Sequence, residues 1–370
     1  QKLSIGARTQ AVADAVAQFL SDVEKDMRIA SILPRDVNSY ATFLKSNTRG
    51  VVQSSQVGVV RIPVPVYHEI QFLNKDGVGV IRVASDGSIL EGNESFAQEE
   101  FFVRAKGLAP GEFYMGPVEG ADVSREEFEA GKRFEGVMRL AAPVFDSTGF
   151  AGVVALSLNV VHLAEFTDHL IPTEPGMVFA EVRAEDMNYA FMVFRNGQVI
   201  SHPADYVIRG YEASGVPAPV WIEENYDELS KTGVGGMNVL NMGFLDENLP
   251  KIHALASEGK AGSITYTLND TRIFRTYATI PYYGDGFSKP EGFGWIGMVV
   301  DIDRYHSLSQ QKVREIQDKV ERWQKSSIVV VFVSLILLFI IALILARGLY
   351  RSIQKIDKDA DQTPLQDDED

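Results

Sequence analysis

The chain is organised around SSIVVVFVSLILLFIIALILA, residues 326–346. This stretch contains no charged residue, and about 20 apolar residues in a helix cross the roughly 30 Å hydrocarbon core of a bilayer. Lys325 precedes it and Arg347 follows it, at positions from which cationic side chains reach lipid headgroups. A buried core helix is the alternative, but such helices are rarely apolar on every face at this length. The stretch predicts a membrane-spanning helix.

Composition bounds what the rest of the chain can be. With 370 residues, of which 45% are hydrophobic, it can build one large or two medium domains besides the span. The net charge of −15 argues against a nucleic-acid partner, which requires a basic face. There is no cysteine, so disulfides and thiolate chemistry are excluded. The short segment 347–370 ends in an acidic run that predicts a solvated, disordered tail.

The orientation of the span cannot be taken from flanking charges, because lysines and arginines are balanced on its two sides. The chain opens at Gln1 without a signal peptide. If the large domain lies outside the cell, we expect an apolar run upstream of Gln1 in the precursor, with both ends of the protein in the cytoplasm.

The N-terminal residues 1–33 predict one long helix. Apolar side chains recur at spacings of three and four, the mark of one buried helix face, and Pro34 ends the pattern. About thirty helical residues reach about 45 Å, which is longer than one small domain needs. We therefore expect this helix to run along two stacked modules.

Hairpins dominate the next part of the chain. A helical patch is expected at 40–52, and then YHEIQFL (67–73) and VGVIRVA (78–84) alternate around an Asp-Gly turn. A helix is predicted at 95–108 with Phe96, Phe101 and Phe102 inward, followed by strands at 112–118, 134–145 and 150–159.

The second half repeats this plan. YAFMVFR (189–195) and QVIS (198–201) flank an Asn-Gly turn, an irregular excursion covers 203–260, and strands return at 262–268, 272–280 and 293–302. Two modules, each with a hairpin, a helical excursion and a closing strand pair, predict an α+β fold with antiparallel sheets.

Residues 304–325 predict a charged stalk helix that leads into the span. Val313, Ile316, Val320 and Trp323 recur at spacings of three and four, as in a short coiled-coil seam. This pattern favours a homodimer, and an extended domain helix is the alternative.

The arrangement resembles the double Cache, or tandem PAS-like, sensor region of bacterial transmembrane receptors of the chemoreceptor and sensor kinase type. The matching pieces are YHEIQFLNKDGVGVIRVASDG, FAQEEFFVRAKGLAPGEFYMGPVEG, RLAAPVFDSTGFAGVVALSLN, YAFMVFRNGQVISHP and GFGWIGMVVDIDRY. The resemblance implies a membrane-distal module at 34–170 and a membrane-proximal module at 171–303. It also implies a small-molecule ligand in the distal module and a periplasmic location on the bacterial inner membrane.

Two departures from the family pattern affect these expectations. Amino-acid-binding members carry an aspartate just after the last strand of the distal module, where this chain has Asn159. Family members also continue into a HAMP segment and an output domain, whereas RGLYRSIQKIDKDADQ looks like a HAMP beginning that stops. We therefore expect either further domains beyond this sequence or a separate cytoplasmic signalling partner.

No catalytic constellation is visible. The histidines lack metal-ligand spacing such as HExxH, and no nucleophile stands beside a base, so the sequence predicts no metal, no cofactor and no enzymatic activity.

A binding pocket is the better hypothesis, and the resemblance to PAS-like modules implies that the ligand lies between the sheet and the helical excursion. Arg82 and Arg139 lie in apolar strands, where an inward arginine needs a carboxylate from ligand or protein. The internal alternatives for such a partner are Glu69, Glu112 and Glu135. The other expected site residues are Tyr67, Phe101, Tyr114, Met115 and Asn159. Each aromatic or Met side chain could equally be core.

The sequence thus leaves a choice of functions. Ligand sensing by a transmembrane receptor is the leading hypothesis, and the ligand is expected to carry a carboxylate if an arginine holds it. A membrane-anchored structural or protein-interaction module without a small-molecule ligand is the main alternative, and an anchored extracellular enzyme is a remoter one.

Overall fold

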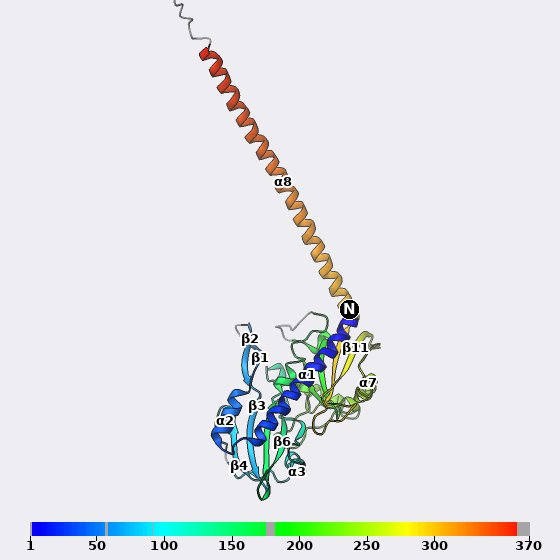
Figure 1. Cartoon of the computed structure of the whole chain (residues 1–370). Helices are drawn as coiled ribbons and strands as arrows, with labels where there is room; N and C mark the ends of the chain where they lie inside the picture. The colour runs from blue at the N-terminus through cyan, green and yellow to red at the C-terminus, as the bar shows by residue number, and fades with distance from the viewer. Residues whose placement is uncertain (1, 56–57, 91, 175–181, 361–370) are drawn as a thin grey trace, which may run out of the picture. The chain divides into compact units, whose positions relative to one another are not determined.

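The computed structural model describes residues 2–55, 58–90, 92–174 and 182–360 (Figure 1). The chain divides into two compact units, Gln1–Asp303 and Arg304–Asp370.

The predicted N-terminal helix is present as α1 (Lys2–Ile32). Its buried face carries Val16, Leu20, Val23 and Met27, which follow the three-and-four spacing of the sequence. A second helix, α2 (Val37–Ser46), begins where the Asp36 side chain accepts a hydrogen bond from the Ser39 backbone N–H, as an N-cap does.

The expected helical patch at 40–52 is wrong in its second half. After α2 the chain forms an antiparallel hairpin of β1 (Thr48–Ser55) and β2 (Gly58–Pro65). Gly50 interrupts helix formation, and the β-branched Val51 and Val52 favour an extended backbone. This hairpin was not predicted, because no turn dipeptide marks it in the sequence.

Module 1 is the part of the chain that carries β3 to β7. Its strands form one antiparallel sheet in the order β4-β3-β7-β6-β5. The elements are β3 (Tyr67–Asn74), β4 (Gly79–Ala84), α3 (Glu100–Lys106), β5 (Tyr114–Gly120), α4 (Arg125–Glu129), β6 (Gly136–Asp146), β7 (Gly149–Asn159) and α5 (Val161–Ala164). The expected helix at 95–108 is shorter than predicted, although Phe96, Phe101 and Phe102 are buried as expected.

Module 2 carries β8 to β12 and has the sheet order β10-β11-β12-β8-β9. Its strands are β8 (Asn188–Phe194), β9 (Val199–Ser201), β10 (Gly262–Leu268), β11 (Thr271–Ile280) and β12 (Gly294–Asp301). Its helices are η1 (Ala184–Asp186), η2 (Asp205–Val207), α6 (Tyr226–Thr232), η3 (Val239–Phe244) and α7 (Asn248–Ser257).

The internal repeat is confirmed in topology and in detail. If the five strands of each module are numbered along the chain, both sheets have the strand order 2-1-5-4-3. Gly152 in β7 has a φ of 152°, and a Cβ built there would lie 2.0 Å from the Leu73 carbonyl oxygen of β3. Gly294 in β12 has a φ of 157°, and its Cβ would lie 2.1 Å from the Val193 carbonyl oxygen of β8. The same close approach, possible only for glycine, therefore recurs in both modules.

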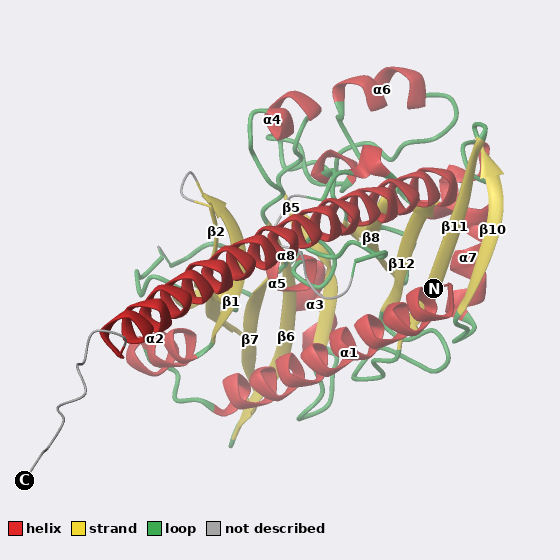
Figure 2. Ribbon diagram, turned by 90° about the horizontal axis from the view of Figure 1, so that it is seen from above, coloured by secondary structure: helices red, strands yellow, loops and turns green. Residues whose placement is uncertain are grey.

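Both modules pack against α1, which lies along one face of both sheets (Figure 2). One core cluster joins residues of α1 to buried side chains of both sheets, among them Leu140 and Leu156 of module 1 and Ile280 and Ile296 of module 2. The expectation of a helix running along two stacked modules is confirmed.

The described part of the second unit is a single helix, α8 (Ile302–Ala360), from Arg304 onward. The Asp301 carboxylate accepts a hydrogen bond of 2.9 Å from the Asp303 backbone N–H at the start of this helix, so the aspartate caps it. Within Ile316–Ile353, α8 contains an 18-residue window that is long and apolar enough to cross a membrane, and none of this window is buried in the protein. That exposure distinguishes it from a core helix. Residues 361–370 of the acidic tail lie outside the described residues.

Candidate ligand site in module 1

The sheet of module 1 has two faces with different character. One face packs on α1 and α2 and is uniformly apolar, with Ile70, Met138, Leu140, Leu156 and Leu158 in a single cluster. The other face lies under α3, and we call it the α3 face. It combines the apolar cluster around Phe101 and Ala155 with polar side chains. Residue alternation along the strands separates the two sets.

Polar residues form two adjoining rows across the α3 face. Glu69 of β3 pairs with Ser157 of β7, which pairs with Arg139 of β6. In the next row, Gln71 stands between Arg82 of β4 and Ala155 of β7. Ala155 in turn pairs with Ala141 of β6. Small side chains at positions 141, 155 and 157 therefore border the glutamine.

Gln71 is the unusual member of this face. Its side chain is 1% exposed, and neither its amide nitrogen nor its amide oxygen has a hydrogen-bond partner among the described residues. A buried amide without partners costs about 1–3 kcal/mol of folding free energy. Such a group in a native protein calls for a water, an ion or a ligand that completes it. Gln71 was not among the predicted site residues, although a glutamine inside the otherwise apolar IQFL run was a visible signal.

Arg82 has two internal carboxylate partners. Its Nε donates to Glu69 at 2.9 Å and its Nη1 donates to Glu94 at 2.5 Å, while its guanidinium lies 5.1 Å from the centre of the Phe96 ring. Glu69 was one of the internal alternatives considered from the sequence, and Glu94 was not. These acceptors favour the charged guanidinium and raise the pKa of Arg82 against the effect of burial.

Arg139 is paired in a similar way. Its Nε donates to Glu119 of β5 at 3.0 Å, and its guanidinium lies 5.3 Å from the centre of the Phe101 ring. Neither Glu112 nor Glu135 is this partner. The β5 strand has a register shift between Met115 and Val118, and this brings Glu119 beside the arginine.

The structure brings together some of the expected site residues and separates others. Phe101 and Tyr114 lie on the α3 face with the two arginines. Tyr67 and Met115 belong to the cluster on the α1 side of the sheet. Asn159 lies at the end of β7, where its Oδ1 accepts a hydrogen bond of 3.1 Å from the Val161 backbone N–H.

The equivalent face of module 2 is filled by its own side chains. Phe191 of β8 pairs with Gly297 of β12, as Gln71 pairs with Ala155 in module 1. A Cβ on Gly297 would lie 2.4 Å from the Phe191 ring, and the Trp295 ring packs at 5.3 Å from that of Phe191. Arg275, at the position of Arg139, is buried and bonded to Asp246 at 2.7 Å.

Among the described residues, no group of three His, Asp or Glu side chains is placed to hold a metal ion. His202 accepts a hydrogen bond at Nδ1 from the Ala204 backbone N–H, and burial lowers the pKa of His202 to about 4. Its imidazole is therefore neutral at pH 7 and serves the turn after β9.

No family model matches the sequence, and no curated protein matches it. Among solved structures, the chain is similar to the ligand-binding domain of the Pseudomonas aeruginosa PAO1 amino acid chemoreceptor PctB in complex with L-arginine. The identity is 15% and the TM-score 0.44, over 83% of this chain and 91% of that chain.

Two further solved structures are similar to this chain. The ligand-binding domain of the Pseudomonas fluorescens chemoreceptor CtaA with L-isoleucine gives 14% identity and a TM-score of 0.40, over 80% of this chain and 91% of that chain. The sensory domain of the Campylobacter jejuni chemoreceptor Tlp3 with isoleucine gives 10% identity and a TM-score of 0.43, over 82% and 93%.

Proposed function

We propose that the chain is the extracytoplasmic sensor region of a membrane-anchored receptor, and that it binds a small polar molecule on the α3 face of module 1. The observation that carries this proposal is the Gln71 amide, buried to 1% exposure with no partner for either polar atom among the described residues. Module 2 has Phe191 at the equivalent position. The polar group in module 1 is therefore not required by the shared fold.

The charges on the α3 face indicate the class of ligand. Arg82 and Arg139 are each held by internal glutamates, and these three glutamates outnumber the two arginines, so the face needs no anionic ligand to neutralise it. A ligand with both donor and acceptor groups matches Gln71, whose amide offers one of each. A carboxylate-bearing ligand would have to compete with Glu69 or Glu119 for an arginine. The site accordingly favours a neutral or zwitterionic molecule over a net anion.

The covering segment can admit such a ligand. Between residues 92 and 113 the only helix is α3, which has seven residues, and the remaining backbone is irregular. Short irregular segments of this kind open at a lower free energy than the sheet they cover. This supports entry of the ligand from the α3 side.

A route for the signal follows from the connections of module 1 and module 2. α1 packs on both sheets, and α8 begins directly after β12. A ligand that binds one arrangement of module 1 better than another shifts the equilibrium between them by its differential affinity. In the proposed receptor, the helices that enter and leave the membrane convey this shift to a cytoplasmic partner or to an output domain beyond this sequence.

The test uses the full chain in lipid nanodiscs, screened for thermal stabilisation against amino acids, amines, polyols and organic acids. A ligand at 100 times its Kd adds about 2.7 kcal/mol of stability. Gln71→Leu removes the amide while keeping a similar volume, so we expect it to stabilise the unliganded protein and to abolish the effect of the ligand. Gln53→Leu, at an exposed position of β1, is the matched control and should bind normally.

Two results would overturn the proposal. A library without any stabiliser would favour the anchored protein-interaction module instead. A ligand that stabilises wild type and Gln71→Leu equally would place the binding site elsewhere in the chain.

A further inference from the structure

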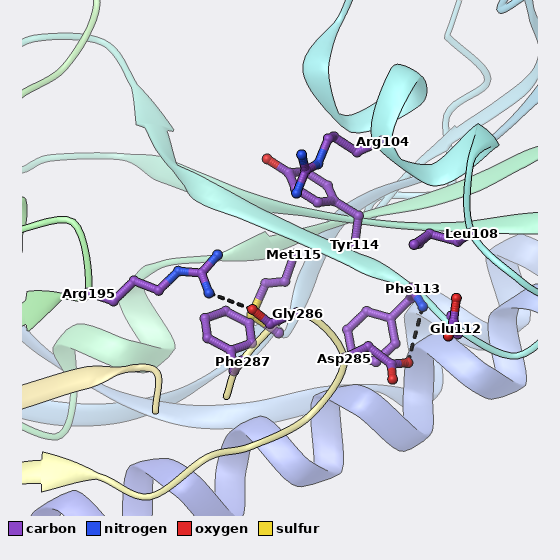
Figure 3. Close-up of a pocket in the computed structure, with 10 residues that line it drawn as sticks. All are labelled: Arg104, Leu108, Glu112, Phe113, Tyr114, Met115, Arg195, Asp285, Gly286 and Phe287. Carbon is purple, nitrogen blue, oxygen red and sulfur yellow. Dashed lines mark hydrogen bonds between the residues drawn. The ribbon is translucent and has the colours of Figure 1, made fainter. Parts of the chain in front are cut away.

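A cavity lies where module 1 meets module 2, next to the end of α3, and Tyr114 of the α3 face is part of its lining. It has a volume of about 160 Å³. Residues from the end of α3, the start of β5, the β8–β9 turn and the β11–β12 loop line it (Figure 3). An engineered cavity of about 150 Å³ holds a benzene molecule, so the space suits a compact ligand.

The cavity has an apolar floor. Phe113 and Met115 of module 1 and Phe287 of module 2 line it, and each is buried to 5% exposure or less. Figure 3 shows Arg104 above these side chains and Arg195 of module 2 at the left of the view. The site therefore combines apolar contact area with cationic walls.

Neither of these arginines has a carboxylate partner among the described residues. Arg195 donates one N–H to the Gly286 carbonyl oxygen and lies 4.5 Å from the centre of the Phe287 ring. Arg104 contacts the Tyr114 ring at 5.9 Å. Arg104 is exposed and Arg195 is half-buried. In contrast, Arg82, Arg139 and Arg275 are each paired with an acid.

The acidic groups of the lining are already engaged. Asp285 accepts a hydrogen bond of 3.2 Å from the Phe113 backbone N–H and faces Arg28 at 3.3 Å. Glu112 accepts a hydrogen bond from the Ala109 backbone N–H. The guanidinium groups thus remain available to an external acceptor, and arginine binds carboxylates through paired N–H donors.

We infer that this cavity binds a small organic acid, with its carboxylate on the arginines and a compact apolar body on the floor. The lining comes from both modules, so the bound acid would add contacts across a junction that the hydrogen bond between Asp285 and Phe113 already bridges. A ligand that binds one junction geometry better than another biases the equilibrium between them. The cavity is thus a second input site, distinct from the site around Gln71.

The test is a ligand-observed NMR titration of the full chain in detergent micelles with benzoate and with benzamide, its neutral counterpart of similar shape. We expect benzoate to bind and benzamide to bind at least about tenfold more weakly, because a charge-assisted pair is lost. Arg104→Gln and Arg195→Gln should each weaken the binding of benzoate by a similar factor. Glu112→Gln should strengthen benzoate binding, because a negative charge on the cavity wall is removed.

Two controls keep the result specific. Arg35→Gln removes an exposed arginine outside the cavity and should leave benzoate binding unchanged. Gln71→Leu should also leave it unchanged, which separates this site from the proposed sensor site. The inference is overturned if benzoate does not bind, if benzamide binds equally well, or if the double variant Arg104→Gln, Arg195→Gln retains wild-type affinity.

Discussion

The Tyr67 hydroxyl donates a hydrogen bond of 2.8 Å to the Asp26 carboxylate, and this contact joins the first strand of the module 1 sheet to α1. Two residues earlier in α1, Glu24 makes the equivalent contact with module 2, because its carboxylate accepts a hydrogen bond of 3.0 Å from the Tyr282 hydroxyl. Thr9 and Thr276 make a third such contact at 2.6 Å. α1 is therefore tied to both sheets by polar contacts as well as by packing.

We expect Tyr67→Phe to destabilise the protein by about 1–3 kcal/mol, because Asp26 then loses its donor in a half-buried place. Burial already raises the pKa of Asp26, so its ionised form is costly there. Asp26→Asn should cost little at pH 7, since the amide oxygen still accepts from Tyr67 and no charge is desolvated. Thermal unfolding followed by tryptophan fluorescence measures both variants. Equal losses for the two would contradict this account.

Arg82→Ala tests how much the internal ion pairs of the α3 face contribute to stability. Glu69, which is 15% exposed, would lose its partner, and we expect a loss of about 1–3 kcal/mol in the unliganded protein. Lys132→Ala is the control, because its pair with Glu127 is solvent-exposed and such pairs contribute about 0–1 kcal/mol. The measurement is the unfolding midpoint without ligand, set beside a ligand titration. Unchanged stability with abolished ligand binding would instead make Arg82 a direct ligand contact.

Much of the sheet architecture could be predicted because its signals are local. The Asp-Gly and Asn-Gly turns at 76–77 and 196–197 lie between alternating strands, and both hairpins are present. The order of the strands in the sheets and the hairpin at 48–65 had no such signal. The two modules have the same order of predicted elements in the sequence. The structure adds that Gly152 and Gly294 occupy equivalent positions in the two sheets.

The site was harder to predict because bulges decide which side chains share a face. A register shift between Tyr67 and Glu69 moves Tyr67 to the α1 side, although simple alternation places both residues on one face. The shift in β5 likewise presents Glu119 to Arg139, whereas unbroken alternation after Met115 would place Glu119 on the α1 side. Neither shift leaves a mark in composition or hydropathy, so partners across strands could not be assigned from sequence.

Asp168 makes stability depend on pH. Burial, followed by the nearby Asp205, raises the pKa of Asp168 to about 8, while its Oδ1 accepts a hydrogen bond of 3.1 Å from Ser201. In the unfolded chain this carboxyl ionises near pH 4, as a free aspartate does, so between about pH 4 and 8 the folded state binds the extra proton. The contribution of Asp168 to stability is therefore fully present below pH 4 and is lost as pH rises toward 8.

We expect Asp168→Asn to remove this loss, because an amide at the same place has no proton to release and still accepts from Ser201. Relative to wild type, the variant should gain stability steadily between pH 5 and pH 8, as measured by unfolding midpoints. Asp86→Asn is the control, since hydrogen bonds from Ser88 lower the pKa of that exposed carboxyl. A difference between Asp168→Asn and wild type that does not change with pH would show that Asp168 ionises normally.

The stalk of α8 provides a test of dimerisation. Ile316, Val320 and Trp323 are 60%, 49% and 73% exposed within one chain, and their spacings of four and three place them on one helix face. In a homodimer this face packs against its copy as a coiled-coil seam. The chain has no cysteine, so Val320→Cys introduces a single thiol. We expect this variant to form a disulfide-linked dimer in membranes under mild oxidation. Asp318→Cys, two residues away and off the seam, should cross-link much less, and equal cross-linking at both positions would indicate random collision in place of a paired stalk.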